Sequence, residues 1–313
     1  MKNILVVGGA GYVGGAVVDL LKANNFNVRV YDLLLYEDHY FKDVDFIFGD
    51  IRDKEKLAIN IEWADVVIWI AALVGDGACE INKDVTYQIN TEALKVLTNF
   101  KDKRTIFFST CSVYGINNNL IDEKAEVNPL STYAQSKIEA EKIINDSNSI
   151  IFRLGTLFGV GDRFSRVRFD LVLNTLTMYA FQKKEINVFG GEQYRPLLHV
   201  KDAAKTILEA CNHDKCGTYN ICKENTRIVD LANEVQENFE DIKVNKIDQP
   251  FQDLRNYRVD CSKAINDLGF NPKLSFSNGI SEIKNLLTEG RVKDLYSTRY
   301  INMKFISDDP IFK

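Results

Sequence analysis

Short apolar runs recur along the first third of the chain, and each ends at a small or acidic residue. The runs cover Lys2–Val7, Asn27–Tyr31, Phe46–Phe48, Asp65–Ile70 and Thr105–Ser109. Such continuous runs are typical of strands that are buried on both faces of a parallel sheet. Helical patterns separate them, so the sequence predicts an α/β fold with a doubly wound parallel sheet.

The first strand is followed by the segment GGAGYVGG, in which Gly8, Gly11 and Gly14 have a GxxGxxG spacing. The helical segment AVVDLLKAN comes directly after it, and the second strand ends at Asp32. Glycines let the backbone approach a pyrophosphate, and the helix N-terminus offers free N–H groups. An acid at Asp32 accepts hydrogen bonds from both ribose hydroxyls and repels a 2′-phosphate. The arrangement predicts a Rossmann domain that binds NAD rather than NADP.

The fifth strand ends on a cluster of hydroxyls and a thiol, Ser109–Ser112. Ligands of doubly wound sheets bind at the carboxyl ends of strands, so we expect this cluster beside the nicotinamide. Tyr133 and Lys137 follow in a segment that is helical from about Ser131, and their spacing places them on one face. The lysine and a cationic nicotinamide lower the pKa of a nearby phenol, which then removes a proton from a substrate alcohol.

Composition and charge narrow the range of partners. The 313 residues carry a formal net charge of −5 without a basic stretch, which argues against nucleic acid. No apolar run is long enough for a membrane span, and the first ten residues are too short for a signal segment. Six scattered cysteines without a CxxC motif favour a reducing cytoplasm. Cys211, His213 and Cys216 lack a fourth ligand, so we expect no metal.

Taken together, the motifs resemble the extended short-chain dehydrogenase/reductases that act on nucleoside-diphosphate sugars. The resemblance covers roughly residues 1–270 and rests on GGAGYVG, Asp32, GDI at 49–51, AAL at 71–73, Ile89-Asn90, STCSVYG, YAQSK, Arg153 with TLFG, and RPLLHVKD at 195–202. It implies that Thr110 hydrogen-bonds the reacting hydroxyl, that Tyr133 is the acid/base, and that Lys137 tunes Tyr133 and holds the nicotinamide ribose. A binding protein without catalysis would be expected to lack one of these three residues.

The resemblance also implies two sets of binding residues. NAD, expected to be tightly bound, would contact Gly8, Gly11, Tyr12, Val13, Asp32, Asp50, Ile51, Ala71, Ala72, Leu73, Asn90, Tyr133 and Lys137. The sugar nucleotide would contact Thr110, Cys111, Ser112, Thr156, Arg163, Arg168, Asn174, Arg195, Arg255 and Tyr257. The three arginines Arg163, Arg166 and Arg168 have two interpretations: ligands of the substrate diphosphate, or a solvated basic loop.

The domain organisation follows from the same resemblance. We expect an NAD-binding domain in residues 1–160, to which 196–222 return, and a smaller, discontinuous α/β substrate lobe in 161–290. The tail, 291–313, lies beyond the pattern and carries no catalytic signature. We also expect a homodimer formed through helices at 86–100 and 131–145.

Departures from the family pattern narrow the reaction. Members that dehydrate sugars carry Asp-Glu after the catalytic threonine, where this chain has Cys111 and Ser112. Members that epimerise C3 and C5 carry a cysteine at the position of Ser112. In this chain the cysteine is shifted by one position, to Cys111, where it is either a small packed residue or an acid in an altered position. The remaining reaction is oxidation or reduction at one carbon, C4 of the sugar. It would make the protein a 4-dehydrogenase, a 4-epimerase or a 4-ketoreductase. Asp32 argues against a reductase that uses NADPH. The segments ALVGD and DRFSRVRFDLVLN resemble a branch that includes GDP-heptose 4-oxidases, so we rank the 4-dehydrogenase first.

Overall fold

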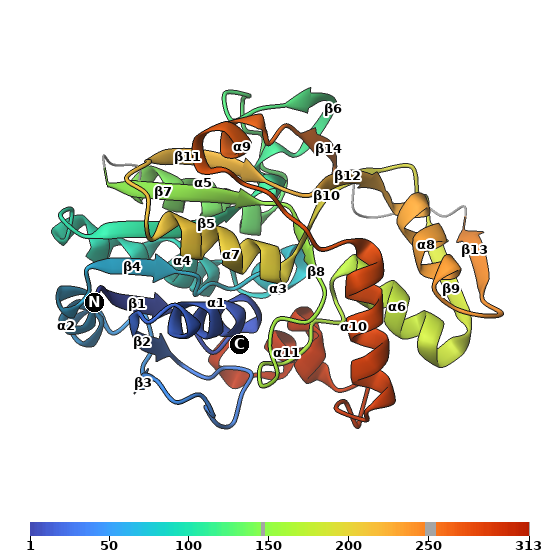
Figure 1. The fold of residues 1–313 in the computed structure, drawn as a ribbon, viewed down its shortest axis with the longest axis horizontal. Helices are drawn as coiled ribbons and strands as arrows, with labels where there is room; N and C mark the ends of the chain where they lie inside the picture. The colour runs from blue at the N-terminus through green and yellow to red at the C-terminus, as the bar shows by residue number, and fades with distance from the viewer. Residues whose placement is uncertain (145–147, 248–254, 313) are drawn as a thin grey trace.

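A seven-stranded parallel sheet forms the centre of the protein in the computed structural model, which describes residues 1–144, 148–247 and 255–312 (Figure 1). Its strand order is β11-β7-β5-β4-β1-β2-β3. The strands are β1 (Asn3–Val7), β2 (Asn27–Asp32), β3 (Asp45–Phe48), β4 (Val66–Trp69), β5 (Arg104–Thr110), β7 (Ser149–Leu154) and β11 (Gly217–Ile221). This order confirms the predicted doubly wound sheet, and the direction of winding changes between β1 and β4.

Both faces of the sheet are buried, as the continuous apolar runs indicate. Along β1, Ile4 and Val6 face one cluster and Leu5 and Val7 face the other, because side chains alternate along a strand. The first cluster includes α1 (Tyr12–Ala23) and α7 (Val200–Ala210). The second includes α2 (Lys54–Trp63), the 3₁₀ helix η1 (Glu92–Asn99) and α5 (Thr132–Ile144).

Helix α1 begins at Tyr12, four residues before the helical segment expected from the sequence. Gly14 and Gly15 therefore lie within the first turns of the helix. A Cβ atom at Gly14 would collide with the carbonyl oxygen of Gly8, and one at Gly15 would collide with the Asp162 carboxylate. These glycines are needed for close packing inside a helix, although their low helix propensity suggests a loop.

A smaller lobe extends from the carboxyl ends of the strands and lies at the right in Figure 1. Its helices are α6 (Val172–Lys183), α8 (Ile228–Glu237) and α10 (Phe276–Thr288). Its short sheets pair β9 (Glu185–Phe189) with β13 (Lys243–Ile247), and β10 (Tyr194–His199) with β8 (Thr156–Phe158) and β12 (Glu224–Arg227). Side chains from α6, β9, α8 and α10 share one apolar cluster, which gives the lobe a core of its own.

The chain crosses between the two parts more than once. After β10, helix α7 packs against α1 and β11 pairs with β7, so residues 200–221 join the main sheet. Later, β14 (Asn256–Val259) pairs with β6 (Ile116–Ile121), and α9 (Ser262–Leu268) packs on β11. The segment 256–270 thus contributes to the main core, although it lies within the boundaries expected for the substrate lobe.

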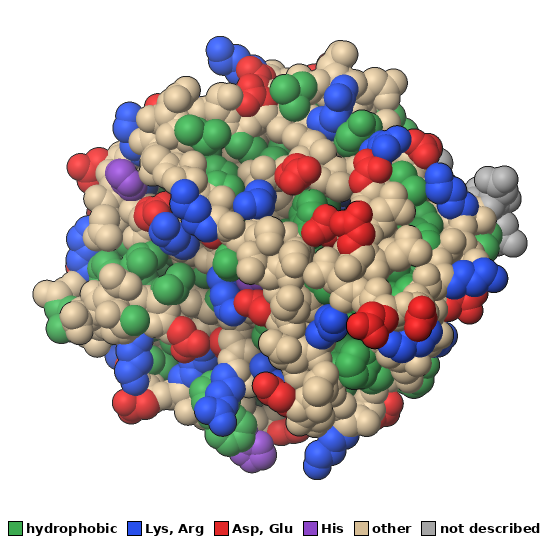
Figure 2. Space-filling model, turned by 45° about the vertical axis from the view of Figure 1, so that its right-hand side comes forward, with side chains coloured by type: hydrophobic (Ala, Val, Ile, Leu, Met, Phe, Trp, Pro, Cys, Tyr) green, Lys and Arg blue, Asp and Glu red, His purple; other side chains and the backbone are tan. Residues whose placement is uncertain are grey.

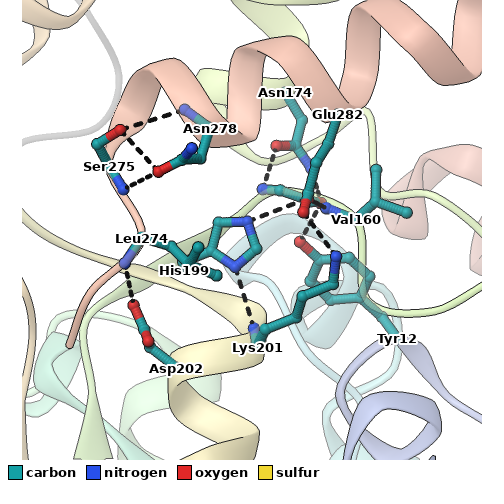
Figure 3. Close-up of polar contacts among 11 residues, drawn as sticks. Tyr12, Val160, Asn174, His199, Lys201, Asp202, Leu274, Ser275, Asn278 and Glu282 are labelled. Carbon is teal, nitrogen blue, oxygen red and sulfur yellow. Dashed lines mark hydrogen bonds and ion pairs between the residues drawn. The ribbon is translucent and has the colours of Figure 1, made fainter.

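Glu282 connects helix α10 of the smaller lobe to the domain that contains the seven-stranded sheet (Figure 3). Its carboxylate contacts His199 Nε2 at 3.1 Å and Lys201 Nζ at 2.6 Å, and it accepts a hydrogen bond from Val160 N at 2.9 Å. His199 Nδ1 accepts from Lys201 N, so the ring donates from Nε2 toward Glu282. One carboxylate therefore links the substrate lobe to the start of α7.

The tail folds back onto the main part and contains η3 (Thr298–Tyr300), α11 (Asn302–Asp308) and η4 (Pro310–Phe312). Helix α11 packs against α3 (Asp76–Ile81), and Phe312 is buried in a cluster with Leu73, Cys79 and Tyr133. The tail, which carries no catalytic motif, thus reaches the neighbourhood of the predicted acid/base.

The segment expected as one helix at 86–100 is divided in the structure. It consists of the end of α4 (Lys83–Asn90) and the 3₁₀ helix η1, separated at Thr91. The Thr91 hydroxyl donates to Ser136 O at 3.1 Å, and the Asn90 amide donates to Leu73 O at 3.0 Å. These side chains hold the break against α5 and the β4 loop.

The surface shows charges of both signs, interspersed on the face seen in Figure 2, without a continuous basic stripe. Among the described residues, no helix is long and apolar enough to cross a membrane. The same part of the chain has no cluster of three His, Cys, Asp or Glu residues suited to a metal ion. Cys211 is buried, and Cys216 accepts a hydrogen bond from Arg104.

Candidate active site

A cavity of about 770 Å³ opens at the carboxyl ends of the central strands. Its walls come from the loops after β1, β2, β4 and β5, from α5, and from the substrate lobe and the tail. This position coincides with the change in winding direction between β1 and β4, where doubly wound sheets bind ligands. Most of the residues predicted from the sequence line this cavity.

The glycine turn after β1 leaves no room for a side chain and brings the backbone to the cavity. Gly8 adopts a positive φ of 91°, and its N–H donates to Tyr31 O at 2.9 Å. A side chain at Gly8 would collide with the backbone of Ala71. Gly11, Tyr12 and Val13 line the cavity at the start of α1, where the first N–H groups of a helix lack intrahelical acceptors.

Asp32 and Asp50 lie beyond this turn, at the carboxyl ends of β2 and β3. The Asp32 carboxylate accepts hydrogen bonds from Ala10 N at 2.9 Å and from Leu34 N at 2.7 Å. Burial raises the pKa of Asp32, against the effect of these backbone donors. Asp50 is held by Arg52 through paired contacts and lines the same end of the cavity as Ile51. The residues present therefore fit the adenosine half of NAD.

The loop after β4 forms the next part of the wall, through Ala71, Ala72 and Leu73. Asn90, expected to contact the cofactor, is buried behind this loop and does not line the cavity. Its Oδ1 accepts from Leu73 N at 2.8 Å, and its Nδ2 donates to Ser136 Oγ at 3.0 Å. Asn90 thus positions the loop against α5.

Thr110, Tyr133 and Lys137 meet at one end of the cavity, although they come from two different elements. Thr110 ends β5, while Tyr133 and Lys137 lie one turn apart on α5. Thr110 and Tyr133 both line the cavity, and the Thr110 hydroxyl lowers the pKa of the Tyr133 phenol, against the effect of burial. Lys137 Nζ donates to Phe108 O at 2.9 Å and lies over the Phe107 ring. The structure therefore brings together the three groups expected for proton transfer.

Burial changes the acid–base properties of this trio. It raises the pKa of Tyr133 above its ordinary value, and the nearby Cys79 and Asp76 add to the effect. Burial also lowers the pKa of Lys137 from 10.5 to about 8. Tyr133 is consequently a neutral phenol in the protein alone. The low pKa expected from the sequence is thus not a property of the protein alone, and a cationic cofactor beside the phenol would lower it.

A buried ion pair supports the strand end from behind. Arg153 Nη2 contacts Glu141 Oε2 at 2.7 Å, and the same carboxylate accepts a hydrogen bond from the Ser109 hydroxyl. Sequence reasoning overlooked Glu141. Its signal is the spacing along α5, because it lies two turns after Tyr133 and one after Lys137.

The structure divides the predicted substrate residues into two groups. Those that line the cavity are Thr110, Ser112, Thr156, Arg168, Arg195, Arg255 and Tyr257. Cys111, Arg163 and Asn174 do not. The Cys111 thiol is fully buried and donates to Arg153 O at 3.1 Å, which makes it a core residue. Asn174 is also fully buried, where it accepts from Gly159 N and donates to Arg168 O, while Arg163 is exposed on the surface.

Arg166, one of the three arginines considered from the sequence, lines the cavity together with tail residues that the sequence did not single out. Arg166 donates to Arg299 O at 2.7 Å and to Asn302, which connects the substrate lobe to the tail. Asn302 is buried and also donates to Val74 O in the loop after β4. Met303, Phe312 and Asp76 complete this side. No local pattern marks the tail residues, because their place in the wall depends on a contact with distant loops.

The glycine turn, the acid at the end of β2 and the Thr-Tyr-Lys trio on one cavity are the pattern of a nicotinamide-dependent oxidoreductase of the extended short-chain type. A family model for the NAD dependent epimerase/dehydratase family matches residues 4–222. The chain belongs to this family of NAD-dependent enzymes that act on nucleotide sugars.

Two curated relatives are similar along most of their length. The "Putative UDP-glucose 4-epimerase" of Methanocaldococcus jannaschii is 29% identical over 304 residues, covering 90% of this chain and 97% of that protein. A dTDP-glucose 4,6-dehydratase of Escherichia coli is 28% identical over 335 residues, covering 90% of this chain and 92% of that protein. The family therefore contains both kinds of reaction, and the choice between them rests on the site.

Among solved structures, the UDP-glucose 4-epimerase of Thermotoga maritima with UDP-glucose superimposes with a TM-score of 0.80. It is 23% identical in sequence, and the match covers 93% of this chain and all of that one. This likeness supports the fold.

Proposed function

We propose that this protein uses NAD to oxidise the C4 hydroxyl of a nucleoside-diphosphate sugar to a ketone. The observation that carries the proposal is the convergence of Thr110, Tyr133 and Lys137 on one cavity, with no carboxylate directly after Thr110. Cys111 is buried in the core and Ser112 carries a hydroxyl, so neither provides the acid and base for eliminating water. A 4,6-dehydratase is thus disfavoured.

The residues of the site divide the reaction among them. Thr110 hydrogen-bonds the substrate oxygen, and Tyr133 removes its proton as the carbon is oxidised. NAD, when bound, accepts the hydride, and its positive ring stabilises the phenolate form of Tyr133. Lys137 supports the same charge from the next turn of α5. The apolar cluster around Tyr133, which includes Phe312, excludes water from the reacting atoms.

The fate of the ketone separates two candidates. We rank release of the 4-keto sugar first, because the segments ALVGD and DRFSRVRFDLVLN resemble a branch with GDP-heptose 4-oxidases. A guanosine nucleotide is proposed on the same basis. A 4-epimerase is the second candidate. The M. jannaschii relative supports it, because that protein is named as a putative UDP-glucose 4-epimerase and the match covers 97% of its length. An epimerase returns the hydride to the other face of the ketone.

Absorbance at 340 nm distinguishes these outcomes. The purified protein is mixed with NAD and with GDP-, UDP-, dTDP- and CDP-sugars in turn, and the sugar is examined by NMR. Accumulating NADH with a ketone product supports the dehydrogenase. A flat trace with an inverted C4 supports the epimerase, and unchanged sugars throughout the panel contradict the proposal.

Tyr133→Phe tests the acid/base assignment. Because the variant keeps the ring and loses only the hydroxyl, NAD binding should survive, while turnover should fall by about a hundredfold or more. Binding is followed by nucleotide fluorescence and turnover by NADH formation or NMR. Turnover that stays within a few fold of the wild type would show that another group moves the proton.

We also propose that the protein is a homodimer formed through α4, η1 and α5. The support is the family resemblance of these helices. Sedimentation velocity measures the mass directly, and a monomer at micromolar concentration would contradict the proposal.

A further inference from the structure

Asp76, the last residue of the segment ALVGD, is a carboxylate in the cavity wall to which the proposed mechanism assigns no role. It follows Gly75, which turns the chain after β4 with a positive φ of 102°, and it is the first residue of α3. Ser131 Oγ donates to its Oδ1 at 2.6 Å, and Arg255 Nη1 lies 3.0 Å from its Oδ2. Two elements that are distant in sequence therefore fix the orientation of this carboxylate.

These partners place Asp76 between the reacting groups and the phosphate-binding side of the cavity. Ser131 stands two residues before Tyr133. Arg255 Nη1 also donates to Ser112 Oγ at 3.0 Å, and Ser112 follows Thr110 at the end of β5. The charge of Asp76 is one of the effects that raise the pKa of Tyr133, which is consistent with this closeness. A sugar held by Tyr133 and Arg255 would thus lie against Asp76.

The other charges of the cavity wall are engaged elsewhere. Arg168 is held by Asp170 through contacts of 2.6 Å and 3.1 Å, and Lys137 donates to Phe108 O. Asp32 and Asp50 lie at the adenosine end. Arg255 is the expected partner of the substrate diphosphate, which would draw its charge away from Asp76. In the bound state Asp76 would then face the sugar with a negative charge that Arg255 no longer balances.

We propose that Asp76 determines specificity by accepting hydrogen bonds from sugar hydroxyls, so that the site takes an uncharged sugar and rejects a uronic acid. This inference rests on the proposed function, because it assumes a nucleoside-diphosphate sugar in the cavity. A carboxylate has about four acceptor positions. Ser131 occupies one of them, and Arg255, which contacts Asp76 in this structure, would turn to the diphosphate when the substrate binds. The remaining positions match neighbouring hydroxyls of a pyranose.

Repulsion between the Asp76 carboxylate and the carboxylate of a uronic acid would exclude such sugars. A carboxylate at C6 of the sugar would lie in a partly buried cavity near a second carboxylate that it cannot neutralise. Like charges within a few ångströms of each other cost enough in such surroundings to reduce affinity by about tenfold or more. The same site binds a hydroxymethyl group at C6 without this penalty.

The experiment compares sugar pairs that differ only at C6. UDP-glucose is compared with UDP-glucuronic acid, and GDP-mannose with GDP-mannuronic acid, by calorimetric titration of the NAD-loaded wild type and Asp76→Asn. The amide keeps the size of the side chain and removes its charge. We expect the wild type to bind the neutral sugar at least about tenfold more tightly, and the variant to reduce this ratio several-fold.

Asp84→Asn is the matched control, because Asp84 is exposed on the neighbouring helix α4 and does not line the cavity. Its ratio should equal that of the wild type. Equal affinity of the wild type for both sugars, or an unchanged ratio in Asp76→Asn, would overturn the role of Asp76 while the proposed function stands. If neither the neutral sugars nor the uronates bind, the proposed function fails and this inference fails with it.

Discussion

At the scale of single residues, function and stability oppose each other at Lys137. Its ammonium group is buried in the cavity wall, where it donates a hydrogen bond to Phe108 O. Burial lowers the pKa of Lys137 from 10.5 to about 8. A charge in such a position destabilises the folded protein. The protein retains it because the phenol of Tyr133 and the cofactor ribose need a cation at this point of α5.

Lys137→Met should therefore stabilise the protein while it removes activity. The folded pKa lies below the unfolded one, so the penalty is fully present below pH 8 and disappears as the pH rises toward 10.5. We expect the free energy of unfolding to rise by roughly 1–3 kcal/mol at pH 7, and the gain to shrink above pH 8. Urea unfolding at pH 7 and pH 10 measures both effects.

The control for this prediction is Lys142→Met on the same helix, where the lysine is exposed. It should change the free energy of unfolding little at either pH. A Lys137→Met protein that is less stable than the wild type at pH 7 would show that the hydrogen bond to Phe108 O outweighs the burial of the charge.

At the scale of elements, α1 shows how a helix and a turn constrain each other. The helix contains Gly14 and Gly15, which are poor helix formers, because the turn at Gly8 and the loop at Asp162 lie where side chains would be. The same close approach leaves the N–H groups at the start of α1 facing the cavity. The helix therefore gives up some intrinsic stability for a site that fits a pyrophosphate.

Gly14→Ala tests this constraint. Alanine favours a helix by about 1 kcal/mol, but its Cβ would meet the carbonyl oxygen of Gly8. We expect the steric conflict to dominate, lowering the free energy of unfolding by about 1–3 kcal/mol and weakening NAD binding by roughly tenfold or more. Denaturant unfolding and nucleotide titration measure the two effects.

Ala23→Gly is the matching change at the exposed end of the same helix. It should lower stability by about 1 kcal/mol at most and leave NAD affinity unchanged. Equal effects of the two variants on NAD affinity would indicate that general loosening of α1, rather than the turn, controls the binding of the nucleotide.

At the scale of the whole molecule, the two parts are joined where the cavity lies. Glu282 on α10 contacts His199, Lys201 and Val160 (Figure 3), while the tail residue Asn302 connects Arg166 of the substrate lobe to the loop after β4. The cavity walls are thus fixed by contacts between segments that are far apart along the chain.

Glu282→Gln should weaken this junction in a pH-dependent way. Burial raises the pKa of the carboxyl, but hydrogen bonds from His199 and Lys201 outweigh it and lower the pKa from 4.5 to about 2. The carboxylate therefore stabilises the fold above pH 4.5, and its contribution is lost as the pH falls toward 2. We expect a loss of roughly 1 kcal/mol at pH 7, because the group is partly exposed to solvent.

Thermal or urea unfolding of both proteins from pH 7 to pH 3 follows this difference, which should shrink below pH 4.5. Glu289→Gln, at the exposed end of α10, serves as the control and should match the wild type. A difference between Glu282→Gln and the wild type that is constant across this range would assign its effect to packing instead of charge.

The sequence by itself determined the doubly wound parallel sheet, the glycine turn before α1 and the place of Tyr133 and Lys137 on one helix face. These features depend on local rules: apolar runs define buried strands, strand ends meet at one edge of the sheet, and residues four apart share a helix face. Because such rules act over a few residues, the β-α-β unit that ends at Asp32 and the shared helix face of Tyr133 and Lys137 could be predicted from the local pattern.

Only the tertiary structure decided which neighbours of these residues face the cavity. It placed Ser112 in the wall and Cys111 in the core, buried Asn90 and Asn174 behind loops, and left Arg163 outside. It also brought Asp76 to Arg255 and the tail to Tyr133. Such contacts join residues that are far apart in sequence and depend on how the elements pack. No local sequence pattern predicts them.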